Sequence, residues 1–455
     1  MNTLKQNEDR VERYLIGRMG RTRRLIDRLV SDARSRQGQR YGHGAMLMAL
    51  FAGLLKGCEP LRSVGRLSER LGLGRKRRKI SDTAHSYLLE RLDDDAPLPL
   101  LVRLVEDMHH RSQLCSDDLG RDRVAIDGKY ESLDHDVRGV AQKFEDREAK
   151  TIYWRLGQLS AVLISAPGRP VLGQRTMRPI PGAQGTAEEL KHTGEMTNIR
   201  PFVDWMREQY GDLATNFSLD AGLWSRDLFA EMDQHGLGIF GNIKNNKREL
   251  ATEAERELRI ERQVHGAWVD SGWERTSRGI VRRRMWRCCA LDGWNGWRHL
   301  RQVILVEQTT RPNDGSAEEV EMRYFGTNLP KAAMSARQLL ALVRRHWSIE
   351  NDCNWTLDVI MNEDNGAWCT TGSAMLSLGV LRMIARNTLQ WLRKRHVTVR
   401  HVRIAPTPIP WAELHELIAA LWVRTGTTLL ERLRTPCRVL TSARRPRAAT
   451  DRPWR

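Results

Sequence analysis

The chain lacks the sequence features of a secreted, zinc-binding or membrane-spanning protein. It has seven cysteines in 455 residues, an odd number with no Cys-x-x-Cys spacing, which argues against a disulfide framework and a zinc module. The longest apolar run, around residues 45–55, is too short to cross a bilayer. The N-terminal stretch MNTLKQNEDRVERYL is too charged for a signal peptide. We therefore expect a soluble cytoplasmic protein with no membrane partner.

Acidic residues are also scarce relative to basic ones. Lys and Arg number 74 against 56 for Asp and Glu, which gives a net charge of +18. A soluble protein this basic typically binds a polyanion, and nucleic acid is the leading candidate. A high-arginine composition inherited from a GC-rich genome is the alternative explanation, but basic residues also cluster locally, in residues 1–40 and 75–79.

The first part of the chain has the hydrophobic pattern of helices. Residues 44–57 form an apolar helical pattern, and residues 98–112 form another. A third helix is expected to begin after Ser81, which is suited to be its N-cap. The helical pattern of 61–72, the basic run 75–79 and this capped helix are compatible with a helix-turn-helix, and equally with two packed helices joined by a solvated basic loop. We therefore expect an all-helical DNA-binding region here.

Further along, short buried strands alternate with helices, which is typical of an α/β core. Residues 245–330 differ, because charge is high, Gly and Trp punctuate the run, and three stretches have the pattern of antiparallel strands. We interpret this segment as a β-rich insertion. A long helix is expected over 335–361 and another over 374–395. The strands expected before the insertion are 123–128, 158–166, 216–222 and 237–241, with helices over 186–210 and 224–234.

The sequence therefore predicts an α/β fold in five segments. Three prolines at 406, 408 and 410 mark a break before a short helix over 411–423 and an Arg/Pro-rich tail of disordered composition. The segments are the helical N-terminal region (1–120), the first part of the core (121–244), the β-rich insertion (245–330), the C-terminal core helices (331–400), and the short helix with its basic tail (401–455).

Three acidic residues stand where a metal site would need them. Asp127 and Asp220 each end a predicted strand, and ligands of an open α/β sheet bind at strand ends. Glu350 lies in the predicted helix 335–361, on the side that we expect to face the sheet. That side also carries Leu339, Val343, His346 and Leu357. Three carboxylates suit Mg²⁺ or Mn²⁺, and two such ions can support phosphoryl displacement. Each acid alone would more often be a cap or turn residue, so the prediction depends on all three.

Basic and aromatic residues near these acids are candidate DNA contacts. Trp347 and Trp355 either stack on a base or fill core, and His346 either contacts a phosphate or packs. The candidate DNA-binding residues are Lys129, Lys244, Asn246, Arg344, Arg345, His346 and Trp347, together with Arg75, Lys76, Arg77, Arg78 and Lys79 of the basic run. Alternative metal ligands are Asp358, Glu363 and Asp364. Base-stacking candidates in the insertion are Trp286, Trp294 and Trp297.

Several short motifs resemble those of the H-repeat-associated group of insertion-sequence transposases. They are IDGK at 126–129, SLDA at 218–221, HWSIEN at 346–351, WTLDV at 355–359 and NED at 362–364. The helical stretch GCEPLRSVGRLSERLG also resembles the region that precedes the core in that family. The resemblance covers roughly residues 40–400, and the motif around Glu350 is the most specific.

The resemblance implies a DDE transposase with an RNase H-like core. The catalytic and metal-binding triad of the family maps onto Asp127, Asp220 and Glu350, which would hold two Mg²⁺ or Mn²⁺ ions. The implied partners are double-stranded DNA, as terminal repeats and target, and a second copy in a synaptic complex at the bacterial nucleoid. The chain departs from related transposases that have a β-insertion, which carry Tyr, Arg and Lys where this chain has Val343, His346 and Leu357. The resemblance therefore does not extend to a hairpin intermediate.

Two other functions remain open from the sequence. One is a catalytically inactive or domesticated sequence-specific DNA-binding protein on the same fold, and the other is a structure-specific RNase H-like nuclease. The presence of all three acids favours an active enzyme. A nuclease would not need the helical N-terminal region or the large insertion, so these two features favour a transposase.

Overall fold

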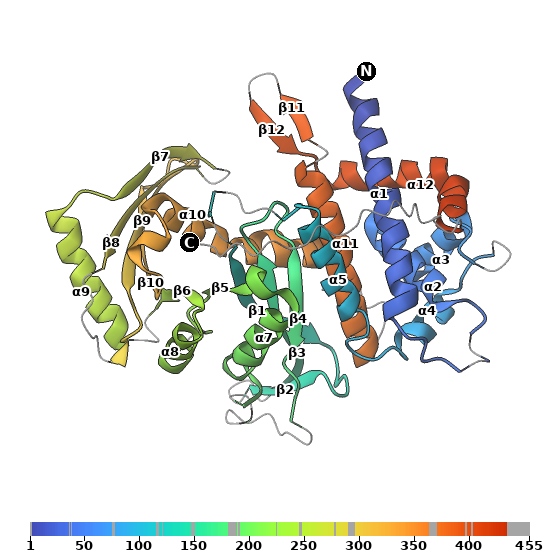
Figure 1. The fold of residues 1–455 in the computed structure, drawn as a ribbon, viewed down its shortest axis with the longest axis horizontal. Coiled ribbons are helices and arrows are strands. Elements are labelled where there is room, and N and C mark those ends of the chain that lie inside the picture. Colours follow the sequence, from blue (N-terminus) through green and yellow to red (C-terminus); the bar gives the residue numbers. More distant parts are fainter. Residues whose placement is uncertain are drawn as a thin grey trace, which may run out of the picture.

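The structure of the chain is a computed structural model. The residues that the structure describes are 2–35, 37, 39–74, 78–114, 118–120, 122–146, 151–180, 189, 192–223, 225–244, 248–276, 279–289, 296–363, 371–395, 398–401 and 404–434. Within them the chain is a mixed α/β protein, with a large sheet beside a group of helices (Figure 1).

The N-terminal part is helical, as expected. It contains α1 (Asn2–Leu29), α2 (His43–Lys56), α3 (Leu61–Arg70), α4 (Asp82–Leu89) and α5 (Leu98–His110). Helix α2 carries apolar residues on all of its faces, and it is buried along most of its length. The oxygen of the Ser81 side chain accepts a hydrogen bond from the Ala84 N–H at 3.2 Å, which confirms the predicted N-cap of α4. Residues 71–81 separate α3 from α4, so these helices are not joined by the tight turn of a helix-turn-helix.

The C-terminal helices pack back onto this bundle. The first, α11 (Gly372–Arg395), packs against α2, α5 and strand β4 (Val171–Thr176), and α12 (Trp411–Arg434) packs against α1, α2 and α3. The helical region and the sheet therefore share one hydrophobic core. No single helix among the described residues is long and apolar enough to span a membrane. The pair α2 and α3 passes that test together, but it bends by 108° at the junction.

Ten strands form one sheet, and three of them are parallel at its centre. The order is β2-β3-β1-β5-β6-β10-β9-β8-β7, with β4 paired to β3. Strand β1 is parallel to β5, and β5 is parallel to β6, whereas the other neighbours are antiparallel. The remaining bounds are β1 (Val124–Leu133), β2 (Ala141–Asp146), β3 (Thr151–Leu163), β5 (Asn216–Leu219), β6 (Gly238–Ile243), β7 (Val269–Arg275), β8 (Gly279–Cys288), β9 (Gln302–Pro312) and β10 (Glu319–Thr327).

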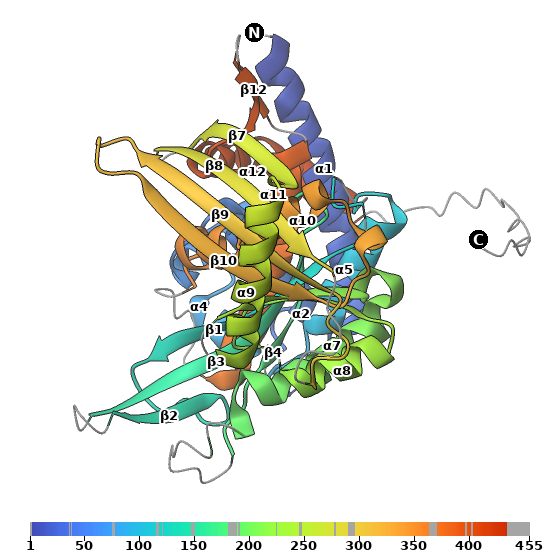
Figure 2. The same ribbon diagram turned by 90° about the vertical axis from the view of Figure 1, so that its left-hand side faces the viewer.

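The strands expected within 245–330 are present, and they extend the sheet rather than forming a separate one. Strand β10 pairs with β6, and β9, β8 and β7 follow outward. A helix that the sequence analysis did not predict, α9 (Arg248–Val264), packs against β8, β9 and β10 (Figure 2). Two helices, α7 (Glu195–Tyr210) and α8 (Arg226–Gln234), connect β4 to β5 and β5 to β6.

Several element boundaries differ from the predictions. The segment 398–408 is a hairpin of β11 (Thr398–His401) and β12 (Ile404–Pro408) rather than a break, and α12 continues eleven residues past the expected end at 423. Residues 435–455 of the expected tail lie outside the described residues. The long helix expected over 335–361 is interrupted. It consists of α10 (Ala336–His346) followed by two π-helical segments, η7 (Ile349–Asn354) and η8 (Thr356–Ile360).

Candidate active site

The two strand-associated acids lie on neighbouring strands at the centre of the sheet. Asp127 follows Ile126 within β1, which continues to Leu133, so it does not end its strand as predicted, whereas Asp220 follows Leu219 at the end of β5. Because Ile126 pairs with Leu219 in the parallel register, the two acids occupy matching positions. Both side chains are half-buried. Whether these strands are neighbours was left open by the sequence, and the structure places them side by side.

Glu350 comes from the π-helical segment η7 rather than from a continuous α-helix. The Trp355 N–H donates to the Glu350 carbonyl, which is the i→i+5 hydrogen bond of a π-helix. The other four residues of the expected inward stripe are buried, whereas Glu350 is exposed. The wider turn changes the direction in which each later side chain points. Because η7 packs against β1 and β3, Glu350 still lies beside the strand of Asp127.

The three carboxylates act on one another electrostatically. Burial, followed by the charges of Glu350 and Asp220, raises the pKa of Asp127 to about 7. Burial and the Asp220 charge also raise the pKa of Glu350. Hard carboxylate oxygens that repel one another in this way suit Mg²⁺ or Mn²⁺, so the donor set fits such a metal. Among the described residues, no three acidic, His or Cys side chains converge closely enough to enclose an ion. The three acids are therefore near one another but do not form a preassembled metal site in this structure.

The pKa of Asp127 predicts that rising pH destabilises the metal-free protein. The folded-state pKa near 7 lies above the usual 3.8, so the destabilisation begins as the pH rises from about 4 and is complete above about 7. Asp127→Asn removes the charge, and we expect this variant to melt at a higher temperature than the wild type at pH 8 in EDTA. Scanning calorimetry at pH 8 and at pH 4 measures the difference.

Two controls make this calorimetric prediction specific. At pH 4 the melting temperatures of the two proteins should nearly converge, because Asp127 is protonated in the folded protein and this pH is close to its ordinary pKa of 3.8 in the unfolded chain. At pH 8, Mn²⁺ should raise the melting temperature of the wild type more than that of Asp127→Asn. An equal rise in both proteins would show that Asp127 does not bind the metal.

A fourth acid, Glu195, lies close to the backbone that follows each of the first two acids. Glu195 is the first residue of α7. Its carboxylate lies so close to Gly128 that a Cβ atom there would clash with it, and a Cβ atom at Gly222 would lie 3.8 Å from the same carboxylate. The Tyr130 side chain forms a hydrogen bond with Glu195, and burial raises the pKa of Glu195. The sequence analysis missed this residue, because an acid in the first turn of a helix is common and nothing local distinguishes it.

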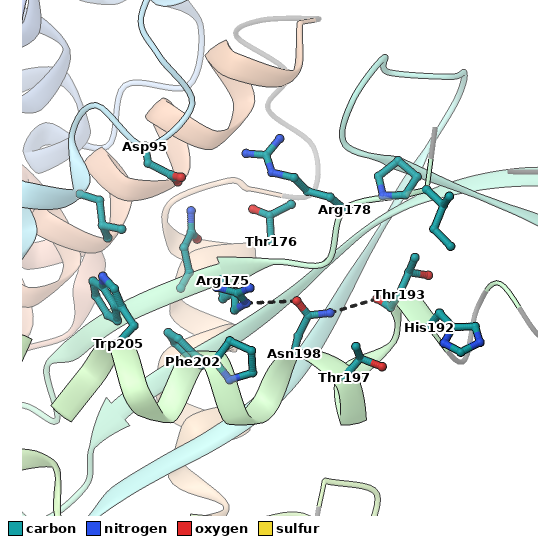
Figure 3. A pocket seen from close by; sticks show the side chains of 15 residues that line it. Asp95, Arg175, Thr176, Arg178, His192, Thr193, Thr197, Asn198, Phe202 and Trp205 are labelled. Carbon is teal, nitrogen blue, oxygen red and sulfur yellow. Dashed lines mark hydrogen bonds between the residues drawn. The ribbon is translucent and has the colours of Figure 1, made fainter. Parts of the chain in front are cut away.

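Hydrogen bonds fix the start of α7 and so the place of Glu195. The Arg175 Nε donates to the Asn198 Oδ1 at 3.1 Å, and the Asn198 Nδ2 donates to the Thr193 carbonyl at 3.3 Å (Figure 3). These residues line a cavity of about 580 Å³ between β4 and α7. None of the three predicted catalytic acids lines it, so this cavity is separate from the acidic cluster.

Lys129 lies in a largely buried ion cluster. Its Nζ lies 2.8 Å from the Glu363 Oε2 and also binds the Asp358 carboxylate. The side chain is only 12% exposed. Its predicted DNA contact is therefore not supported, because two carboxylates already hold its charge. The same contacts occupy Asp358 and Glu363, which were the alternative metal ligands; Asp364 lies outside the described residues.

An open cavity of about 790 Å³ lies at the ends of β5 and β6, beside Asp220. The Lys244 Nζ lies 3.3 Å from the Asp220 Oδ1, and about half of the Lys244 side chain is exposed. Trp347 also lines the cavity, and the Arg323 guanidinium lies 5.1 Å from the centre of its ring. Lys244 and Trp347 are thus the predicted DNA contacts that lie next to the acidic cluster.

Three other predicted contacts near Glu350 are already paired. His346 is 3% exposed, its Nδ1 lies 2.9 Å from the Ser218 Oγ, and burial lowers its pKa to about 4. The imidazole is therefore neutral and internal, which agrees with the packing role that the sequence left open for it and not with a phosphate contact. Arg344 is exposed and pairs with Glu274 at 2.9 Å, and Arg345 pairs with Asp118.

The remaining candidates divide between buried, exposed and undescribed positions. Trp286 and Trp297 are 3% and 8% exposed, so they fill core rather than stack on bases. Among the described residues of the insertion, the exposed tryptophans are Trp268 and Trp273. Outside the insertion, Trp355, five residues after Glu350, is 46% exposed. In the basic run, Arg78 is exposed and Lys79 is half-buried. The predicted contacts that lie outside the described residues are Arg75, Lys76, Arg77, Asn246 and Trp294.

Comparison with known proteins finds partial similarity to transposases. The chain is 33% identical over 96 residues to the putative transposase YncI of Escherichia coli O157:H7, which covers 20% of this chain and 23% of that protein. It is 35% identical over 86 residues to the H repeat-associated putative transposase YhhI of Escherichia coli K12, which covers 19% and 20%.

A longer but weaker match is to the putative protein YbfL of Escherichia coli K12. It is 24% identical over 218 residues, covering 45% of this chain and 54% of that protein. The chain thus spans between a fifth and about half of the length of the relatives it matches. No family model matches the chain. Parts of the chain are therefore similar to proteins named as transposases, including one that is H repeat-associated.

Proposed function

We propose that this protein is a DDE transposase that cleaves DNA at the ends of an insertion sequence and joins them to target DNA. The observation that carries the proposal is the matched position of Asp127 and Asp220 on neighbouring parallel strands, with Glu350 close enough to raise the pKa of Asp127. The partial similarity to named transposases supports DNA as the substrate class.

The topology around these acids supports an RNase H-like core. In the order β4-β3-β1-β5-β6, the first three strands are antiparallel neighbours and the last three run parallel. This arrangement places the two strands that carry Asp127 and Asp220 side by side at the centre of the proposed core. Strands β7 to β10 then follow β6 in the chain, between the second and third acids, which is where an insertion in such a core would stand.

The proposed metal site uses residues of this chain in defined roles. Asp127, Asp220 and Glu350 would hold two Mg²⁺ or Mn²⁺ ions. Such ions, when bound, activate a water or a 3′-hydroxyl and stabilise the leaving oxygen. Lys244 is paired with Asp220 and is partly exposed. Its ammonium is free to turn towards a DNA phosphate once the carboxylates hold metal. His346 contributes through its hydrogen bond with Ser218 of β5, which fixes the position of the chain just before the segment that carries Glu350.

The proposed partners follow from this reaction. They are the terminal repeats of the element, the target DNA, and a second copy of the chain in a synaptic complex at the bacterial nucleoid. Val343 and Leu357 are buried, and His346 is neutral and internal. None of these three side chains is available for the role of the charged or phenolic residues in related transposases, so the proposal does not include a hairpin intermediate.

A cleavage assay on the native locus tests the proposal. The substrate is a supercoiled plasmid that carries the reading frame with its flanking DNA, incubated with purified protein and Mg²⁺. We expect metal-dependent breaks at two inverted repeats, and Asp220→Asn should lower their rate by about 10³-fold, since metal stabilisation of several kcal/mol corresponds to a factor of ten per about 1.4 kcal/mol.

The other outcomes of the assay identify the alternatives. Specific binding to the flanking DNA without any cleavage would indicate an inactive or domesticated DNA-binding protein. Cleavage at branched or single-stranded junctions regardless of sequence would indicate a structure-specific nuclease. Breaks that persist in the Asp220→Asn protein would come from a contaminant or from another site, and they would contradict the proposed mechanism.

A further inference from the structure

Two helical faces in the N-terminal region meet in an arginine-rich groove. The lining arginines of α1 recur at i, i+3 and i+7, and the lining residues of α5 recur at i, i+4 and i+7, so each set lies on one face of its helix. Helices α1 and α5 pack against each other. The groove has a volume of about 400 Å³ and is lined by Arg21, Arg24, Arg28, Arg103, Asp107 and His110.

Positive charge exceeds negative charge in this groove. Asp107 is the one carboxylate in the lining, and three arginines already bind it: Arg21 at 3.1 Å, Arg18 at 3.5 Å and Arg111 at 2.9 Å. Arg24 and Arg28 are exposed, and neither has an acidic partner among the residues that the structure describes. At least two guanidinium groups therefore face solvent with no carboxylate to neutralise them.

We propose that this groove binds the phosphate backbone of double-stranded DNA. Seven residues of helix from Arg21 to Arg28 span about 10 Å at 1.5 Å per residue, which is about the rise of three base pairs along the axis of a DNA duplex, at about 3.4 Å each. Guanidinium groups bind phosphate with two parallel hydrogen bonds, which favours arginine over lysine at such a site. Contacts of this kind position a duplex without reading its sequence.

The groove is also anchored to the catalytic part of the fold. Helix α5 packs against β4 and α7 and also against α1, so it lies between α1 and the sheet (Figure 1). DNA held on α1 and α5 would therefore keep a fixed relation to the strands that carry Asp127 and Asp220. This inference rests on the proposed function for the identity of the polyanion, but not on catalysis.

Binding measured without metal tests the groove independently of cleavage. The probe is a fluorescein-labelled 30-base-pair duplex of mixed sequence in EDTA, with the dissociation constant measured by anisotropy at several KCl concentrations. Arg24→Ala/Arg28→Ala should weaken binding and reduce the slope of log affinity against log salt by about 2, roughly 1 per arginine. Arg24→Lys/Arg28→Lys should keep most of the slope, because the charges remain.

A matched pair on α3 serves as the control. Arg62 and Arg66 are also exposed and four residues apart, and they lie on the helix pair that would contact DNA in a helix-turn-helix arrangement. Arg62→Ala/Arg66→Ala should leave affinity and slope unchanged. An unchanged slope in Arg24→Ala/Arg28→Ala, or a reduced slope in the α3 variant alone, would overturn the proposal.

The remaining outcomes separate the groove from the catalytic proposal. Because every one of these arginines is exposed, circular dichroism melts should match the wild type and exclude misfolding. Absence of duplex binding by the wild type would also overturn the proposal. So would stronger binding to single-stranded RNA than to the duplex, if Arg24→Ala/Arg28→Ala weakened that RNA binding. Normal binding with no metal-dependent cleavage would contradict the proposed transposase and leave the groove supported.

Discussion

Glu350→Gln is expected to lower metal-dependent DNA cleavage by about 10³-fold or more while DNA binding persists. The substitution removes a carboxylate charge next to Asp127 and Asp220 without changing the size of the side chain. The lost metal stabilisation of several kcal/mol sets the magnitude, at a factor of ten per about 1.4 kcal/mol. The measurement is the rate of plasmid cleavage in Mg²⁺, beside an anisotropy measurement of duplex binding.

Asp358→Asn provides the comparison, because Asp358 is the nearest rival for the third ligand. Its carboxylate binds the Lys129 ammonium, and Glu363 remains as a second partner for that lysine. We therefore expect Asp358→Asn to keep cleavage within about tenfold of the wild type, with any loss arising from a less stable fold. Full activity in Glu350→Gln together with loss in Asp358→Asn would reassign the third catalytic acid to Asp358.

Lys129→Met is expected to destabilise the protein by about 3 kcal/mol. Removing one partner of a buried ion cluster costs roughly 3–5 kcal/mol, because the remaining charges are left unpaired. The lower end applies here, since Asp358 is still 23% exposed, whereas Glu363 is 7% exposed. The cluster joins β1 to the segment just after Glu350. The loss of unfolding free energy is measured by urea unfolding, followed by tryptophan fluorescence.

The triple variant Lys129→Met/Asp358→Asn/Glu363→Gln is the matched control. It removes all three charges together, so no buried charge is left without a partner, and we expect it to recover most of the stability lost in Lys129→Met. A surface lysine that binds DNA would behave differently, because Lys129→Met would then weaken duplex binding and leave the unfolding midpoint unchanged. That result would restore the DNA contact predicted for Lys129 from the sequence.

The sequence was most informative where residue type alone constrains structure. Ser81 was predicted as an N-cap because a hydroxyl before a helical pattern can accept the free N–H groups of the first turn, and it does so at Ala84. The apolar run of α2 predicted a buried helix, and the strands through Asp127 and Asp220 were found by their buried residues. These are local patterns, which depend on neighbours within a few residues.

Predictions that required a long-range partner were less successful. Lys129 has the charge of a phosphate ligand, but Asp358 and Glu363, more than 200 residues later, hold its ammonium. His346 has the chemistry of a phosphate contact, yet Ser218 and the surrounding core keep it buried and neutral. Glu195 was not recognised, because only the folded chain brings it against Gly128 and beside Gly222.

By itself, the sequence determined the basic charge, the helical first part, the alternation of strands and helices, and the three acids of the candidate site. Tertiary structure decided how those acids meet. The parallel pairing of β1 and β5 brings Asp127 and Asp220 to matching positions, and the π-helical segment moves Glu350 from the expected buried stripe to the exposed rim beside them. The physical reason is that strand pairing and helix register depend on packing between distant segments, which no local hydrophobic pattern records.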